Sequence, residues 1–255
     1  MPTLSCQIQP SLSGDTLAAL EASGSTLHLF KAVQDTDAAG RPLNWMTIPQ
    51  LLASTNITWT EQYQAYIAPL TALSSTLPVP AGTSVAVAEG QVANVVQGGF
   101  GAVTTTGGTT GAISIANGSS SPYTCGLSVQ SNAAFAPICA FPLYGGNTQV
   151  ITPLMQVVLM FSTAVMPPGT VLAPSRPTTP TGSGVRIEEA SFSRALLVDL
   201  QGAPGGSRSV AYDINSGWSW GGETWASMVS DLLPALIQPD AADGTPTGGR
   251  RMELR

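Results

Sequence analysis

Residues 217–221 match the G-x-S-x-G pattern that surrounds the nucleophilic serine of many hydrolases. In that fold a histidine takes the proton of the serine and follows it in the chain. The only histidine here, His28, lies about 190 residues before Ser219 and inside an apolar strand pattern. We therefore expect His28 to be a hydrogen-bonded structural residue and Ser219 to be unreactive, and we predict no catalytic residue.

The side chains that best suit ligand binding are aromatic and surround the same pattern. Two tryptophans two residues apart point to one face of an extended chain. Their rings would pack on the C–H face of a sugar, while polar neighbours would take its hydroxyls. The predicted ligand-binding residues are Trp218, Trp220, Trp225, Tyr212, Asp213, Asn215 and Glu223. The same pattern is also typical of sheet core, and exposed aromatics suit a lipid–water boundary.

A second aromatic group is similar in kind. Trp59, Tyr63 and Tyr66 alternate with polar residues that include Glu61 and Gln62. The alternation fits a half-exposed strand, and cross-strand packing in a sheet explains it as well as a sugar site does. We expect core packing at this group and treat it as the next surface to test.

The three cysteines predict at most one disulfide. Cys125 and Cys139 enclose a short loop, where a disulfide would add about 3 kcal/mol in the chain-entropy model. Two buried thiols, which behave as small hydrophobic groups, are the equal alternative. Cys6 has no expected partner. With no C-x-x-C pair and a single histidine, we predict neither a metal site nor a cofactor.

Two pairs of acidic residues resemble functional sites, a calcium loop and a carboxylate dyad, but their spacing supports neither. Asp35 and Asp37 resemble the start of a calcium loop, but position twelve is Met46 where an EF-hand has glutamate. We expect a solvated turn there. Glu188 and Glu189 are neighbours on an expected strand, so their side chains point to opposite faces and form no carboxylate dyad.

The chain carries very little charge for its length. Only 9% of its 255 residues are charged, against roughly 25% in an ordinary soluble domain, while 43% are hydrophobic. That composition suits a sheet protein with uncharged faces, often extracellular or self-associating. The net charge is −6 and Lys31 is the only lysine. The sequence therefore predicts no nucleic-acid partner and no attraction to an anionic membrane surface.

The sequence contains no recognisable targeting or membrane-spanning segment. No stretch reaches the ~20 apolar residues of a transmembrane helix, and the first ten residues lack the basic and apolar regions of a signal peptide. If Met1 is the native start, we expect a cytoplasmic protein, one exported by another route, or one packaged in a particle. Removal of a leader would leave ordinary secretion open.

Short apolar runs separated by turn residues predict an all-β fold: an antiparallel β-sandwich or jelly roll with long loops and one or two short helices. Helices are expected at residues 15–23 and 224–237. Residues 13–15, which begin with Ser13, open the first helix with a capping residue, and Gly24 ends it. Residues 83–87 and 91–96 are predicted to form a hairpin. Residues 98–111 are either a flexible linker between two halves or a long hairpin loop, and we expect the loop. The other expected strands are residues 3–9, 26–33, 45–48, 57–67, 113–115, 157–161, 185–192, 194–200 and 208–214.

We expect a single domain over residues 1–238 and a disordered polar tail over residues 239–255. The function that best fits is a non-catalytic, lectin-like recognition protein that binds glycan. One alternative is a membrane-active protein, such as a pore-forming toxin, on a neutral lipid surface. Another is a self-assembling structural protein, since the low charge also suits a homo-oligomer. An enzyme ranks last because no convergent acid, base and nucleophile are visible.

Overall fold

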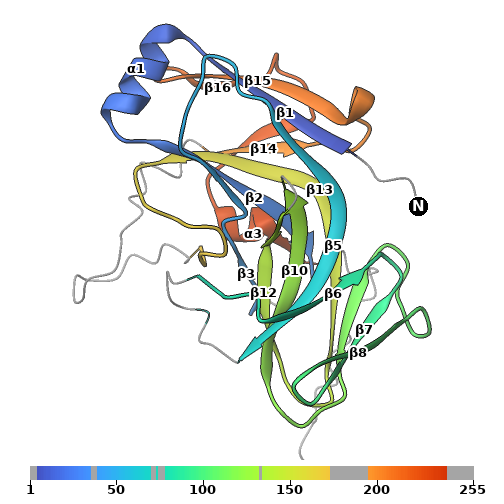
Figure 1. The fold of residues 1–255 in the computed structure, drawn as a ribbon. Coiled ribbons are helices and arrows are strands. Elements are labelled where there is room, and N and C mark those ends of the chain that lie inside the picture. Colours follow the sequence, from blue (N-terminus) through green and yellow to red (C-terminus); the bar gives the residue numbers. More distant parts are fainter. Residues whose placement is uncertain are drawn as a thin grey trace, which may run out of the picture.

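The computed structural model describes residues 5–35, 39–69, 73, 78–131, 134–172 and 195–239. Strands dominate these residues and helices are few, so the predicted all-β fold is confirmed (Figure 1). The predicted strand 185–192 with Glu188 and Glu189, Asp37, and the tail from residue 240 lie outside the described residues.

The first sheet gathers strands from both ends of the chain. Its order is β16 (Gly217–Ser219), β15 (Ser207–Asp213), β1 (Ser5–Leu12), β5 (Ile57–Pro69), β10 (Tyr123–Ser131), β12 (Cys139–Leu143) and β3 (Arg41–Pro42). Two further strands branch from it: β11 (Ala134–Pro137) pairs with β10, and β6 (Thr83–Val87) pairs with β5. The N-terminal strand β1 is therefore interior to this sheet, between β15 and β5.

The second sheet is built on the longest strand, β13. Its order is β17 (Ala226–Val229), β14 (Ala195–Asp199), β13 (Thr148–Ser162), β9 (Ile113–Asn117), β7 (Val92–Val96) and β8 (Gly99–Thr104). On the other half of β13 lies β2 (Thr26–Gln34), which also pairs with β4 (Met46–Ile48) and β18 (Ile237–Gln238).

Both sheets are mixed, which corrects the purely antiparallel expectation. The pairs β1–β15, β7–β9 and β18–β2 are parallel. A parallel pair needs a long crossover, and the intervening chain supplies it. The sandwich or jelly-roll arrangement and the single domain stay predictions.

Two of the expected elements near residue 90 are strands but do not pair with each other. β6 pairs with β5, whereas β7 pairs with β8 and β9. The predicted loop 98–111 contributes β8, an uncharged strand at the end of the second sheet. The hairpin prediction was wrong because the Glu89–Gly90 turn carries the chain from one sheet to the other.

Two short α-helices accompany the sheets in the part of the chain that the structure describes. In α1 (Gly14–Ala22) the Ser13 hydroxyl accepts a hydrogen bond from the Thr16 amide, which confirms the predicted capped helix. The helix predicted at residues 224–237 was wrong: β17 pairs with β14, and only α3 (Leu232–Leu236) is helical. A 3-10 turn, η1 (Pro204–Gly206), precedes β15.

The main core lies where side chains of the two sheets meet. It includes Ile8 of β1 and Leu127 of β10 from the first sheet, and Leu29 of β2 from the second. Successive side chains of a strand point to opposite faces, so the other face of β2 is also buried. There Phe30 packs in a second apolar cluster with Leu236 of α3.

Candidate functional site

The predicted aromatic site divides between core and surface. Tyr212 and Trp218 face each other across the β15–β16 pair and are 3% and 6% exposed. Phe161 of the second sheet lies 4.6 Å from the Tyr212 ring and stacks on Trp218 at 5.4 Å, centroid to centroid. We call these three residues the aromatic contact. Tyr212 and Trp218 therefore join the two sheets, and little of either ring is exposed to a ligand.

Trp220 and Trp225 stay half-buried, at the two ends of a loop over residues 220–225. This loop connects the edge strands β16 and β17, and so passes from one sheet to the other. The Trp220 Nε1 donates to the Glu223 carbonyl at 2.8 Å, and the Arg208 guanidinium lies 4.8 Å from the Trp225 ring centroid. We call Arg208, Trp220, Glu223 and Trp225 the tryptophan edge.

The remaining two predicted residues belong to the turn between β15 and β16. The Asp213 carboxylate accepts the amides of Asn215 and Ser216 at 2.9 and 3.0 Å, and the Thr16 hydroxyl at 3.2 Å. Hydrogen bonds from Ser216 and then Asn215 hold the pKa of Asp213 below its ordinary value. Asp213 therefore shapes the turn, while Asn215 lies exposed on it.

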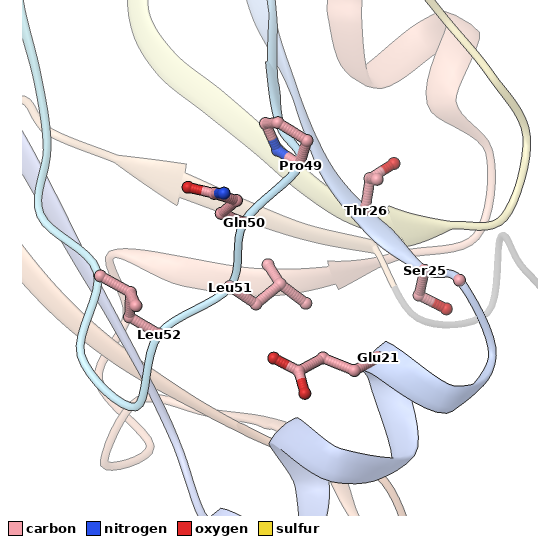
Figure 2. Close-up of a pocket in the computed structure, with 8 residues that line it drawn as sticks. Glu21, Ser25, Thr26, Pro49, Gln50, Leu51 and Leu52 are labelled. Atoms are coloured by element: carbon pink, nitrogen blue, oxygen red, sulfur yellow. The ribbon is translucent and has the colours of Figure 1, made fainter.

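An open pocket lies between the end of α1 and the loop before β5 (Figure 2). Its volume is about 540 Å³. Figure 2 shows the Glu21 carboxylate directed toward the loop that carries Gln50 and Leu52, whose side chain is 59% exposed. No sequence pattern marked this loop. The pocket is lined by Glu21, Gly24, Ser25, Thr26, Pro49, Gln50, Leu51 and Leu52.

The main core contains a buried ion pair that joins the two sheets. Lys31 of β2, fully buried, donates from Nζ to Oε1 of Glu61 on β5, whose side chain is 7% exposed. The rings of Trp45 and Trp59 lie 5.7 and 5.6 Å from Nζ, which is cation–π range. We call Lys31, Trp45, Trp59, Glu61 and Tyr63 the Lys31 site.

Hydrogen bonds hold both carboxylate oxygens of Glu61. Trp59 Nε1 donates to Oε1 at 2.7 Å, and the Tyr63 hydroxyl donates to Oε2. Burial alone would raise the pKa of Glu61, but the charge of Lys31 and the three donors outweigh it and lower that pKa. Burial and then the Glu61 charge raise the pKa of the Cys6 thiol to about 11.

Strand irregularities place the two charged residues. The register of β5 against β10 shifts between Tyr63 and Thr60, so Glu61 lies in a β-bulge. The register of β13 against β2 shifts beside Lys31, between Val157 and Pro153. Bulges redirect side chains and are frequent next to functional sites.

The structure confirms that Trp59, Tyr63 and Tyr66 are buried in the sheet. Sequence reasoning missed the ion pair that lies among them. The available signal was Lys31 itself, the only lysine, on the same strand face as the apolar Leu29.

His28 is structural, as predicted. Its Nε2 lies 2.8 Å from the Thr26 hydroxyl and its Nδ1 lies 3.1 Å from the Thr47 hydroxyl. The ring is fully buried, and burial lowers the pKa of His28 to about 4. Ser219 is exposed at the end of an antiparallel pair and not on a strand-to-helix turn. That setting does not resemble the hydrolase elbow.

The predicted disulfide is not formed. Cys125 pairs with Phe141, two residues beyond Cys139, so the two cysteines are diagonal neighbours on adjacent strands. Such positions lie roughly 7–8 Å apart, beyond the reach of most disulfides. All three thiols, including Cys6, are buried, and burial raises the pKa of Cys139 to about 12.

Asp35 is not on a solvated turn, as we had expected. It is 2% exposed, and the Gln149 amide donates to both of its carboxylate oxygens at 2.7 Å. Within the described ranges, no group of three or more histidine, cysteine or acidic side chains is arranged to hold a metal ion. No helix among those residues is long and apolar enough to cross a membrane.

Comparison with known proteins adds no relative. The chain matches no protein-family model, no curated protein and no solved structure. The functional argument therefore rests on the surfaces and sites described above.

Proposed function

We propose that this is a recognition protein that binds saccharide at the tryptophan edge. The observation that supports it most is the pair of half-buried indoles, Trp220 and Trp225, at the two ends of one surface loop. An indole that keeps part of its face in water offers apolar area to the C–H face of a sugar. The Arg208 guanidinium and the exposed Glu223 carboxylate supply a donor and an acceptor for hydroxyl groups.

The distribution of charge supports the same end of the molecule. Exposed acidic residues such as Asp15 and Glu21 lie on α1, and Glu223 lies after β16. Figure 1 shows α1, β15 and β16 together at one end, away from β6, β7 and β8. Charged side chains that could bind sugar hydroxyls therefore lie at this end, although the chain as a whole has few charged residues.

A glycan array followed by titration of the best ligand tests the proposal. Trp225→Ala should weaken binding at least about tenfold, or about 1.4 kcal/mol, because the stacking face is lost. Its matched control is Leu52→Ala, which changes an exposed apolar side chain in the pocket and should leave the affinity unchanged. Loss of binding in the control alone would move the site to the pocket. Absence of any glycan ligand would refute the proposal.

A second candidate, contact with a neutral lipid surface, rests on the opposite end. Residues 62–175 contain one charged residue, Glu89. Val96 and Tyr144 are 48% and 55% exposed there. The turns next to Val96 and Tyr144 both lie at the end of β9. There the Asn117 amide donates to the Asn147 carbonyl, and the Gly118 amide donates to the Val95 carbonyl. An uncharged surface with exposed apolar and tyrosine side chains suits a lipid–water boundary.

Vesicles of neutral phosphatidylcholine separate the two candidates. Lipid contact predicts co-sedimentation with the vesicles that Val96→Asp reduces and Trp225→Ala leaves intact. Dye leakage from the same vesicles would report membrane activity. Light scattering of the protein alone reports self-assembly, the remaining alternative. Sugar recognition predicts neither sedimentation nor leakage.

A further inference from the structure

The Lys31 site holds an amine against a carboxyl group in a space closed to water. Lys31 is fully buried, and its Nζ is hydrogen-bonded to Glu61 Oε1. In water an amine and a carboxylate rarely condense, because both are charged, hydrated and dilute. Fixed side by side, such groups reach effective concentrations of about 10⁵–10⁸ M. Folding therefore supplies the proximity that this condensation lacks in solution.

We propose that Lys31 and Glu61 condense to an amide that covalently joins β2 to β5. The ammonium first gives a proton to the carboxylate. The neutral Nζ then attacks Cδ, the N–C bond forms, and one C–O bond breaks. The departing hydroxyl takes a second proton that comes from the nitrogen. One ammonium and one carboxylate thus become one amide and one water, with no oxidant or cofactor required.

The two donors on Glu61 fit the two oxygens of this reaction. The ammonium donates to Oε1, so Oε1 receives the first proton and is the oxygen that leaves as water. It also accepts the Trp59 Nε1–H at 2.7 Å, which holds it in place. Attack on Cδ places negative charge on the other oxygen, Oε2, which already accepts the Tyr63 hydroxyl. A donor fixed before the reaction stabilises such an oxyanion.

The surroundings favour the amide once it has formed. Two ions buried between the sheets keep a desolvation cost that a neutral amide of the same atoms does not have. The indoles of Trp45 and Trp59 border the site and keep water from reversing the reaction. The ion pair is the starting state of the reaction.

The mass of the protein decides between these states. The cross-linked chain is about 18 Da lighter than its sequence, the mass of one water. Because Lys31 is the only lysine, a lysine-specific protease cuts the denatured chain once, into residues 1–31 and 32–255. An amide on Lys31 blocks that cut. We expect the lower mass and an uncut chain; the full sequence mass together with complete cleavage would overturn the proposal.

Variants assign the link to these residues. Lys31→Arg and Glu61→Ala should restore the full mass of their own sequences, and Tyr63→Phe should leave a larger fraction of cleavable chain. Glu89→Gln, the matched control at the neighbouring exposed acid, should keep the loss of about 18 Da. Fragment spectra of the wild-type protein locate the branch even if a variant fails to fold. A loss of water that persists in Lys31→Arg, or a branch between other residues, would refute the assignment.

Discussion

The two sheets meet through two buried contacts of opposite chemistry. The aromatic contact joins them with the rings of Phe161, Tyr212 and Trp218, whereas the Lys31 site joins them with an ion pair between indoles. Ring packing stabilises through apolar area and tolerates small shifts. A buried ion pair is stable only while each charge keeps its partner. The first contact therefore provides adhesion between the sheets, and the second fixes one alignment of β2 against β5.

The largest effect should come from breaking the polar contact at one side. Glu61→Ala leaves the Lys31 ammonium buried without a carboxylate and should cost at least about 3–5 kcal/mol of unfolding free energy. Urea denaturation measures it. Glu89→Ala, at the neighbouring exposed acid, should cost less than about 0.5 kcal/mol. Equal and small effects of both variants would show that the polar contact does not hold the sheets.

At the aromatic contact, the loss of unfolding free energy should depend on how much buried apolar area a substitution removes. Trp218→Ala should cost about 3–5 kcal/mol, the usual range for truncating a buried tryptophan. Trp220→Ala, two residues away and half-buried, should cost about 1–2 kcal/mol because less area leaves the core. Thermal or urea unfolding compares the two. A larger loss in Trp220→Ala would contradict the division between core and tryptophan edge.

Acid should destabilise the fold first through His28, which belongs to neither contact. The pKa of His28 is lowered from 6.5 to about 4, so the unfolded chain binds its proton first as the pH falls. The contribution of His28 to the free energy of unfolding is fully present above about pH 6.5. It should fall by about 3 kcal/mol toward pH 4, since one pKa unit is roughly 1.4 kcal/mol. His28→Gln should remove this slope in urea titrations across that range.

In the His28→Gln protein, Glu61 and Asp213 should both contribute to a loss of stability below pH 4.5, because the pKa of each is lowered in the fold. The contribution of Glu61 should be absent where Glu61 is condensed with Lys31, because that carboxyl group no longer exists. The aromatic contact contains no carboxyl or imidazole group. An unchanged slope between pH 6.5 and 4 in His28→Gln would contradict the assignment to the histidine.

Sequence reasoning recovered what local chemistry determines. Alternating side chains predicted β2 and β5, and the Ser13 cap predicted α1. It failed where pairing joins distant segments. Nothing near β1 indicates that it lies parallel to β15, about 200 residues away, because parallel pairing depends on the path of the whole chain.

Sequence reasoning about the candidate sites also failed where contacts join distant segments of the chain. Trp218 and Trp220 were predicted as one binding pair, but Phe161 from the other sheet covers Trp218 and leaves Trp220 at the surface. No spacing rule connects Lys31 with Glu61, since they meet across two sheets and a bulge directs one of them. Residue type and alternation predicted that these side chains are buried. Which distant side chain covers each of them depends on the tertiary structure.

The scarcity of charge between residues 62 and 175 gives the molecule an electrical polarity. Among the described residues, exposed acids such as Asp15 and Glu223 lie at the α1 and β15 end, and the β6–β8 end carries Glu89 alone. A positively charged resin or electrode should therefore capture the protein by its acidic end and turn the neutral end outward. A layer of molecules held in this way would present one uniform, uncharged face to whatever flows past it.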